Sequence, residues 1–260
     1  MTEHRRLPIS AYIRTKNEAF LISEVVTAAR QIASEVLVVD SGSSDDTIAL
    51  AEQAGARVLR HDWRGNGRQK RIAEDEAAFD WLFDLDADEI ITPALASEIS
   101  ALFANGAPPL SIYRTPMAYA PPVGVPWIGF GGVKRHKLYD RRAVRQPDHA
   151  AWDQFDIPEG VTTGTLSHPI LHHAWRDTEH LVDKINRNSS TRARLLTPKP
   201  RALLGLRILF GLPIYFAKRY FLDGLFRGGI QGFAFSITSA YGRWLRDVKM
   251  YERLRLGGER

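Results

Sequence analysis

Apolar and polar positions alternate in a regular order along the first 105 residues. Short apolar runs predict four strands, over residues 7–13, 35–39, 56–59 and 81–85. Between and after them, apolar residues recur every three or four positions and predict helices over residues 19–32, 47–54, 69–79 and 94–103. Strands that alternate with helices through tight links are typical of an α/β fold, with a mostly parallel central sheet flanked by helices.

Polar and acidic residues follow three of the predicted strands. They are Asn17-Glu18, Asp40 and Asp86-Ala87-Asp88. Because ligands of open α/β sheets bind beyond the carboxyl ends of the strands, these residues are expected to line one crevice. Asp86 and Asp88 are two positions apart in a turn, so both carboxylates can face one divalent cation, and such an ion stabilises a leaving diphosphate. A solvent-exposed acidic turn is the alternative.

The second half of the chain has a weaker pattern. Residues 118–132 are rich in proline, glycine and aromatic residues, which predicts a long ordered loop, and residues 134–144 resemble a strand around Leu138-Tyr139. In that loop, Trp127 and Phe130 have two possible roles. Their aromatic faces form either a platform on which an acceptor substrate stacks (an acceptor platform), or a buried anchor of the loop. Residues 203–217 are apolar but are interrupted by Pro213, and residues 220–244 are amphipathic.

Charge is distributed unevenly along the chain. Residues 201–260 contain 11 Lys/Arg and 4 Asp/Glu, whereas the first 200 residues contain 24 and 26. The same tail has 11 of the 26 aromatic residues. Neither apolar stretch reaches the roughly 20 residues that span a bilayer, so the tail is expected to lie in the plane of an anionic membrane surface. A helical hairpin packed on the main domain or on a second subunit is the alternative.

Composition excludes several classes of protein. The chain has no cysteine, which rules out a disulfide scaffold, a thiolate zinc site and a cysteine nucleophile. The N-terminus lacks the apolar core of a signal peptide, so a cytoplasmic location is expected. A nucleic-acid-binding protein needs a basic groove with stacking residues, whereas the body here is slightly acidic and acids line the predicted crevice.

Several segments together resemble family 2 glycosyltransferases with the GT-A fold, and the bacterial glucosyltransferases that extend the lipopolysaccharide inner core. They are residues 38–47 (VVDSGSSDDT), 62–70 (DWRGNGRQK), 84–89 (DLDADE), 171–177 (LHHAWRD) and 184–187 (KINR). The resemblance covers nearly the whole chain and is strongest in its first third.

The resemblance implies a role for individual residues of the donor site. Thr15, Asn17 and Glu18 match the strand end that approaches the nucleoside, and Asp40 matches the aspartate that hydrogen-bonds the base, usually uracil. Lys70 lies in the stretch that meets the base or the diphosphate. A helix-capping acid at position 40 and a solvated helix face at position 70 are the corresponding alternatives.

The metal site is implied in the same way. Asp86 and Asp88 match the metal motif, in which the second residue usually ligates a Mg²⁺ or Mn²⁺ ion and the first lies near the ribose and sugar. Adjacent His172 and His173 would face opposite sides of a strand, so one of them can reach the metal or the diphosphate. An ordinary half-buried histidine is the alternative.

An inverting transferase also needs a base within hydrogen-bond reach of the acceptor hydroxyl. Relatives tend to have a His-Glu pair where this chain has Trp152-Asp153, so Asp153 is assigned as the catalytic base. Asp148 and Asp156 are close rivals, and Trp152 in place of the usual histidine is a departure from the family pattern.

The resemblance thus predicts an inverting transfer of a hexose, glucose from UDP-glucose, to a membrane-linked glycan such as the lipopolysaccharide core. Residues 1–200 are expected to form the catalytic domain, with a donor half of about 1–105 and an acceptor half of about 106–200, and residues 201–260 a basic helical tail. The tail would hold the protein on the inner face of the bacterial inner membrane. A polyprenyl-phosphate acceptor and a non-catalytic nucleotide-sugar-binding protein are the remaining alternatives.

Overall fold

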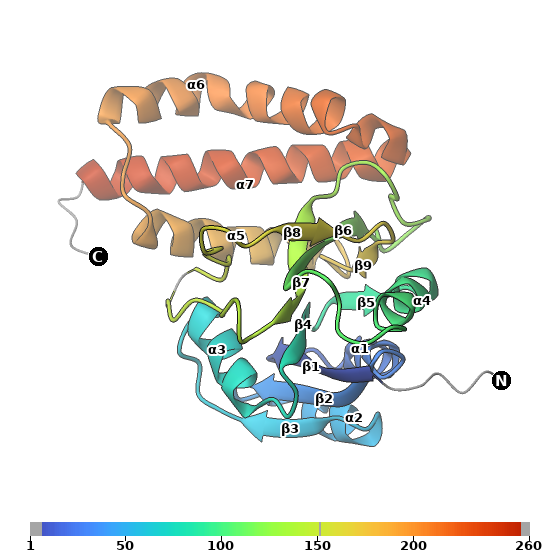
Figure 1. Cartoon of the computed structure of the whole chain (residues 1–260). Helices are drawn as coiled ribbons and strands as arrows, with labels where there is room; N and C mark the ends of the chain where they lie inside the picture. Colours follow the sequence, from blue (N-terminus) through green and yellow to red (C-terminus); the bar gives the residue numbers. More distant parts are fainter. Residues whose placement is uncertain (1–6, 151, 256–260) are drawn as a thin grey trace. The chain divides into compact units, whose positions relative to one another are not determined.

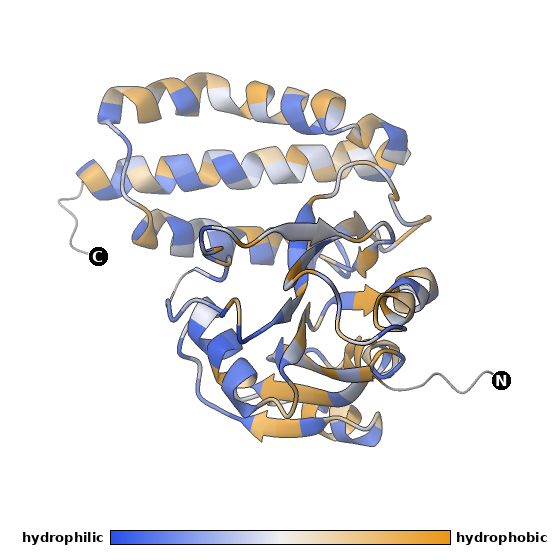
Figure 2. Cartoon of the chain, viewed as in Figure 1, coloured by the Kyte–Doolittle hydropathy of each residue, from blue (hydrophilic) through white to orange (hydrophobic). Residues whose placement is uncertain are grey.

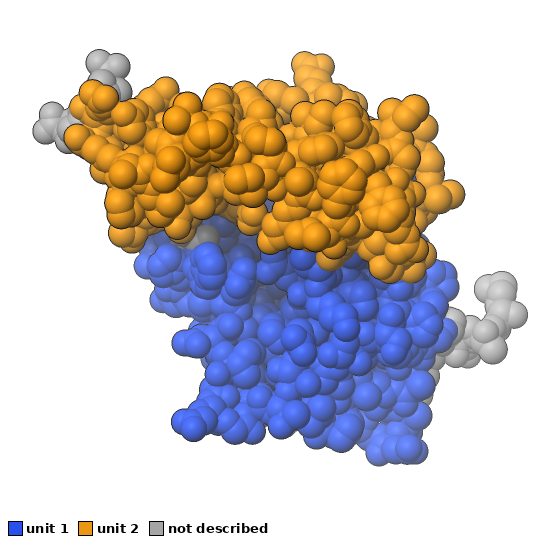
Figure 3. Space-filling model, turned by 90° about the horizontal axis from the view of Figure 1, so that it is seen from above, with its two compact units in different colours: residues 1–117, 133–172 blue, residues 118–132, 173–260 orange. Residues whose placement is uncertain are grey.

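The computed structural model describes residues 7–150 and 152–255. The chain divides into two compact units, which Figure 3 colours separately. Unit 1 comprises Met1–Met117 and Val133–His172, and unit 2 comprises Ala118–Gly132 and His173–Arg260. The N-terminal residues 1–6, part of the segment that shows no signal-peptide core, lie outside the described residues.

Unit 1 is built on a mixed sheet whose strand order is β3-β2-β1-β4-β7-β6-β9-β5, with β8 paired to β6 (Figure 1). Strands β1 to β4 form the parallel half, whereas β7 pairs antiparallel with both β4 and β6, and β5 pairs antiparallel with β9. The predicted α/β fold is confirmed, and the sheet is mixed, because the other half is antiparallel apart from the short parallel pairing of β8 with β6. The strands are β1 (Leu7–Thr15), β2 (Ala33–Asp40), β3 (Arg57–Arg60), β4 (Trp81–Asp86), β5 (Glu89–Ile91), β6 (Ile112–Tyr119), β7 (Lys134–Asp140), β8 (Thr163–Thr165) and β9 (Ile170–His172).

Helices cover both faces of the parallel strands. They are α1 (Ile22–Ala29), α2 (Thr47–Gln53), α3 (Asn66–Glu76) and α4 (Pro93–Leu102). Alternate residues of each strand enter different cores: Ile13 and Val38 pack with α1 and α4, whereas Tyr12 and Leu37 pack with α3. Because both faces are buried, the strands are apolar along almost their whole length, as Figure 2 shows.

The described part of unit 2 contains three α-helices and one long loop. The helices are α5 (Thr178–Leu195), α6 (Arg201–Ala217) and α7 (Gly229–Arg255). A short π-helical segment η1 (Lys218–Leu222) and a 3₁₀ segment η2 (Leu225–Gly228) connect α6 to α7. The helical tail is therefore confirmed, but Pro213 does not interrupt it, because α6 continues through this residue. Among the residues described, no helix is long and apolar enough to cross a membrane.

The predicted ordered loop at residues 118–132 belongs to unit 2. Trp127 pairs with Tyr119 in an isolated β-bridge, and the residue is only 3% exposed. The ring lies in an aromatic cluster, 5.7 Å from the ring of Phe235 and 6.0 Å from that of Trp175. Trp127 is therefore a buried anchor, and its interpretation as an acceptor platform is wrong for this residue.

Candidate functional site

The polar ends of β2, β1 and β4 lie side by side in unit 1. In the parallel register, Thr15 of β1 stands opposite Asp40 of β2, and Arg14 stands opposite Asp86 of β4. The carboxyl ends of parallel strands meet at one edge of a sheet, which is where such folds bind ligands. The acidic residues that end separate strands in the sequence are thus brought to one place.

Arg14 joins four segments of the site. Its Nε donates to Asp86 Oδ1 at 2.8 Å, one Nη donates to Asn66 Oδ1 at 2.9 Å, and the other donates to Asp153 Oδ2 at 3.1 Å. The guanidinium fork thereby fixes the metal-motif aspartate and the candidate base relative to each other. Arg14 was not predicted from the sequence, although it is the only charged residue of β1 and stands near the strand end.

Lys70 provides the second cation of this group. Its Nζ is 2.7 Å from Asp84 Oδ2 and 3.7 Å from carboxylate oxygens of both Asp86 and Asp153. The Lys70 and Asp84 side chains are each 4% exposed. Lys70 is therefore a buried residue of the site, and its interpretation as part of a solvated helix face is wrong.

The electrostatics of the group favour ionised side chains. Burial by itself raises the pKa of Asp86, but the nearby charges of Arg14, Lys70 and Lys137 hold it well below its usual range. Burial lowers the pKa of Arg14, and the carboxylates of Asp86 and Asp153 outweigh this effect and raise it. The carboxylate of Asp86 is thus an anion at neutral pH.

The acidic turn after β4 is held by a buried ion pair. Glu89 Oε2 accepts a hydrogen bond from the backbone N–H of Asp86 at 3.0 Å and lies 2.6 Å from Lys137 Nζ. Burial raises the pKa of Glu89, whereas the pKa of Lys137 rises because Glu89 and neighbouring aspartates outweigh the effect of its burial. The pair fixes the turn that contains Asp88.

Asp88 lies beside a histidine from another strand. Because Glu89 of β5 pairs with His172 of β9, the His172 ring approaches the turn, and its Nε2 is 3.4 Å from Asp88 Oδ2. A carboxylate and an imidazole are suitable ligands for a divalent metal ion. Within residues 7–150 and 152–255, no group of three or more His, Asp or Glu side chains is placed to hold a metal ion. A cation here would therefore need further ligands from a bound donor.

The segment that contains Asp153 is positioned by the N-terminus of α3. The backbone N–H of Asn66 donates to the carbonyl of Ala150 at 2.8 Å, and that of Gly67 donates to the carbonyl of His149 at 3.0 Å. A Cβ on Gly67 would lie only 2.3 Å from the Trp152 carbonyl oxygen. Gly67 is thus required for the close approach that brings Asp153 to the Arg14 guanidinium.

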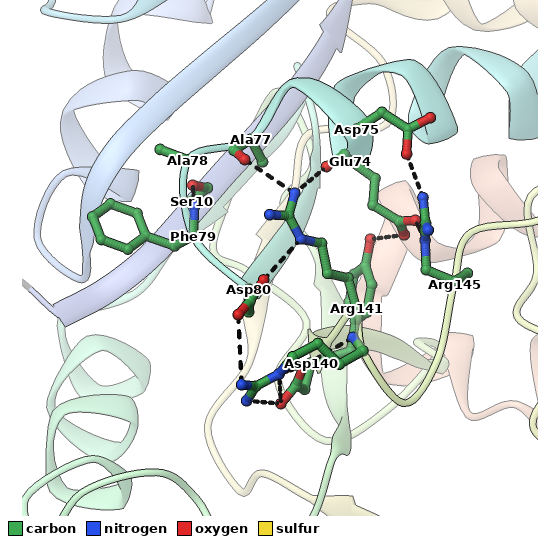
Figure 4. A network of polar contacts seen from close by, with 12 residues as sticks. Ser10, Glu74, Asp75, Ala77, Ala78, Phe79, Asp80, Asp140, Arg141 and Arg145 are labelled. Carbon is green, nitrogen blue, oxygen red and sulfur yellow. Dashed lines mark hydrogen bonds and ion pairs between the residues drawn. The ribbon is translucent and has the colours of Figure 1, made fainter.

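Arginines anchor the start of the same segment to α3, as Figure 4 shows. Arg141 Nε donates to Asp80 Oδ1 at 3.1 Å, and an Nη of the same residue donates to the Glu74 carbonyl at 2.8 Å. Arg145 forms ion pairs with the carboxylates of Glu74 and Asp75. These contacts fix the start of the loop that leaves β7 and leads to Asp153.

Only one of the three candidate bases joins the group around Arg14. Asp148 is exposed and pairs with Arg68 at 2.9 Å, and Asp156 is also exposed. Asp153 is bound by Arg14 and lies 3.7 Å from Lys70. Trp152, which departs from the family pattern, is exposed.

A pocket of about 410 Å³ opens beside the end of β2. Asp40 is almost fully buried, and its Oδ1 accepts hydrogen bonds from the backbone N–H groups of Gly42 and Ser43, each at 2.9 Å. Asp40 therefore shapes the loop that walls the pocket. The pocket is lined by Asp40, Gly42, Ser43, Ile48, Arg60, His61, Asp62 and Arg64.

The other predicted donor-site residues lie at the end of β1. The Asn17 side chain accepts a hydrogen bond from the backbone N–H of Ser44 at 2.9 Å, and the backbone N–H of Glu18 donates to Thr47 Oγ1 at 2.8 Å. The buried Thr15 hydroxyl has no hydrogen-bond partner among the described residues. Asn17 and Glu18 thus connect the end of β1 to the loop after β2 and to the start of α2.

Comparison with known proteins identifies the family. The model of glycosyl transferase family 2 matches residues 10–143, which is just over half of the chain. The chain belongs to glycosyltransferase family 2. The matched part of this transferase contains Arg14, Asp40, Lys70, Asp86 and Asp88, but neither Asp153 nor helices α5 to α7.

Two relatives match this transferase over nearly its whole length. A glycosyltransferase of Rickettsia felis is 32% identical, and the match covers 95% of this chain and 90% of the relative. The lipopolysaccharide core biosynthesis glycosyltransferase LpsC of Rhizobium meliloti is 29% identical, with 95% and 93% covered. Among solved structures, glucosyl-3-phosphoglycerate synthase of Mycobacterium tuberculosis, in complex with Mn²⁺ and UDP, is 24% identical; the match covers 43% of this chain and 44% of that one with a TM-score of 0.36.

Proposed function

We propose that this glycosyltransferase, with a GT-A catalytic domain, moves glucose from UDP-glucose to a sugar of a membrane-linked glycan such as the lipopolysaccharide core, with inversion at the anomeric carbon. The observation that carries the proposal is the Arg14 group, in which one guanidinium binds both Asp86 of the metal motif and Asp153. A donor-side acid and a candidate base are thus held at the same strand edge. The near full-length match to LpsC supports the acceptor class.

The donor is assigned to the pocket beside β2. Asp40 and the following loop would bind the uracil base, with Thr15, Asn17 and Glu18 close to the nucleoside. Arg60 and Arg64, which also line this pocket, provide positive charge near the donor. We assign Lys70 to the diphosphate, because its ammonium nitrogen is 3.7 Å from Asp86 Oδ1.

A Mg²⁺ or Mn²⁺ ion would be held by Asp88 and His172, with Asp86 beside them. The chemistry of the arrangement fits such an ion, because Asp88 Oδ2 and the His172 imidazole are 3.4 Å apart. The acids of the group also outnumber its cations: Asp84, Asp86, Asp88, Glu89 and Asp153 against Arg14, Lys70 and Lys137. When bound, the ion supplies positive charge that stabilises the diphosphate as it leaves. Glu89 and Lys137 keep the turn in place for this role.

Asp153 is assigned as the base. Its carboxylate would take the proton of the acceptor hydroxyl while the hydroxyl oxygen forms a bond to the anomeric carbon and the bond from that carbon to the UDP oxygen breaks. Arg14 binds Asp153 Oδ2, so Oδ1 is the oxygen assigned to receive the proton. Attack opposite the leaving group gives inversion.

Isothermal titration with UDP, with and without Mn²⁺ and beside GDP and dTDP, tests the donor site. We expect UDP to bind only when Mn²⁺ is present, and GDP and dTDP not to bind. The Asp88→Asn variant should lose this binding of UDP. Asp183→Asn, an exposed carboxylate of α5, is the matched control. Asp84 is unsuitable as a control because it is buried against Lys70.

The reaction itself is tested by UDP release from UDP-glucose with isolated membrane glycan as acceptor. Asp153→Asn should abolish release without weakening UDP binding. Binding of UDP that needs no metal ion, or full activity of Asp88→Asn, would contradict the metal assignment. Nucleotide binding without UDP release from UDP-glucose would favour the non-catalytic alternative, whereas absence of nucleotide binding under all conditions would contradict the donor site itself.

A further inference from the structure

Five aromatic rings cluster where α6 connects to α7 in unit 2. The Tyr220 ring lies within 6.3 Å of four others, measured between ring centroids. The four are Phe216, Phe221, Phe226 and Phe233. We call residues 216–233, which contain these rings, the hairpin turn.

The hairpin turn exposes much of its apolar surface. Leu222 is 81% exposed and Ile230 is 87% exposed, and more than half of the Phe221 side chain is also accessible. Large apolar side chains exposed together in one turn are uncommon on proteins that have no partner, and they mark an interaction surface. Helix α6 extends the patch, because Leu206, Phe210 and Ile214 share one of its faces and line an apolar groove.

The charges around this surface are almost all positive. Residues 201–243 contain six Lys/Arg and one acid, Asp223, which lies 2.6 Å from Arg219. Lys218 and Arg227 of the turn are exposed. A partner with negative charge and an apolar interior complements such a surface, and an anionic lipid membrane has both properties.

A second copy of the chain complements the surface poorly. A symmetric contact would place the same patch on both sides, so the exposed Lys218 and Arg227 of one copy would face those of the other. The one acid of the turn, Asp223, is already paired with Arg219. Interface cores are also depleted of charged residues such as lysine. Charge therefore favours lipid over self-association.

We propose that the hairpin turn inserts Phe221, Leu222 and Ile230 into the boundary between headgroups and acyl chains of an anionic membrane, with the apolar face of α6 lying in the interface plane. The inference deepens the proposed function, on which it rests for its purpose, since a membrane-linked acceptor would then be presented to the enzyme in two dimensions. It concerns unit 2 alone and needs neither donor nor acceptor.

The test uses the full chain and its lack of cysteine. Leu222→Cys and Ile230→Cys give unique sites for an environment-sensitive fluorophore, and Val125→Cys, at an apolar position 76% exposed on the loop of unit 2, is the matched control. The labelled proteins are mixed with two kinds of vesicle. One is pure phosphatidylcholine, and the other also contains about 30% phosphatidylglycerol, which is on the order of the anionic lipid content of a natural membrane. Sedimentation of the unlabelled protein with the same vesicles gives the affinity.

We expect a blue shift at positions 222 and 230 with anionic vesicles only, and none at position 125. The double substitution Leu222→Ser/Ile230→Ser should weaken sedimentation at least about tenfold, and Lys218→Gln about fivefold, since each cation near the surface contributes a factor of this size. A thermal melt unchanged by these exposed substitutions confirms that the fold is retained.

Two results would overturn the inference. The first is equal binding to neutral and anionic vesicles, or no binding to either. The second is a dimer in solution in which the label at position 222 is shielded before any lipid is added. Vesicle binding with no transferase activity would sink only the proposed function, whereas activity without vesicle binding would sink only this inference.

Discussion

Replacing Gly67 by alanine tests how closely the Asp153 segment must approach α3. The new methyl carbon would lie 2.3 Å from the Trp152 carbonyl oxygen and 2.5 Å from that of Pro147. Ordinary van der Waals contact begins at 3.4 Å, so the backbone before Asp153 must move by about 1 Å. The neighbouring atoms belong to the backbone, so no side chain can rotate away to make room.

A displacement of this size would move Asp153 away from the position proposed for the base. Misplacing a reacting group by 1 Å can cost roughly 100-fold in rate, which corresponds to about 2.7 kcal/mol in the activation free energy. We therefore expect the kcat for UDP release to fall about 100-fold in Gly67→Ala. The affinity for UDP should change less than about threefold, because Asp40 and Asp88 do not lie on the displaced segment.

Gly205→Ala in α6 is the matched control, since a Cβ there meets no atom within 4 Å. It should leave kcat unchanged and stabilise the helix slightly. If a crystal structure of Gly67→Ala shows Asp153 displaced while kcat is retained, Asp153 is not the base. If the segment has not moved, the steric argument itself is refuted.

Three further substitutions test the buried groups. Lys70→Met leaves the Asp84 carboxylate without the ammonium 2.7 Å away, so urea denaturation should show a loss of about 3–5 kcal/mol in the free energy of unfolding; a loss below about 1 kcal/mol would contradict this. Trp127→Ala removes a buried ring of unit 2, so the free energy of unfolding should fall by about 3–5 kcal/mol while the affinity for UDP stays unchanged. A raised KM for the acceptor at normal stability would instead support the acceptor-platform interpretation. Burial raises the pKa of Asp247, but hydrogen bonds from Arg246 and Arg207 hold this pKa below its usual value. The stabilisation of the folded state by the Asp247 carboxylate is therefore complete above about pH 4, and it is lost as the pH falls through the folded-state pKa. The difference in unfolding free energy between wild type and Asp247→Asn should therefore shrink below about pH 4, and a difference equal at pH 3 and pH 7 would argue against the ion network.

Apart from the short strand β5, the order of strands and helices in the first 105 residues could be predicted from the sequence, because helices bury both faces of the parallel strands. A strand buried on both sides must be apolar along its length, and this leaves a local signal. The acids after β2 and β4 were also visible, since a strand end is marked by the change from apolar to acidic residues. A local pattern was sufficient to predict an element wherever the residues of that element alone show whether it is buried.

Element boundaries were less certain where contacts came from elsewhere. Helix α1 begins at Ile22, later than the predicted residue 19, because Asn17 has a positive φ of 56° and binds the loop after β2. Helix α6 continues through Pro213, although proline removes a helical hydrogen bond, because α6 packs along α7. A window of sequence around either position does not contain the partner segment.

The sequence by itself determined the fold class and which acids follow the strands, and it pointed to the family that the comparisons then showed. Only the tertiary structure decided which of those acids meet. Arg14, Asn66, Asp86 and Asp153 are far apart in the chain and come together through strand pairing and the close contact at Gly67. The burial of Trp127 also depends on the tertiary structure, because it results from the helices that cover the ring. Periodicity records whether a residue is buried, but not which residue it is buried against, because that partner lies at a separation no local pattern encodes.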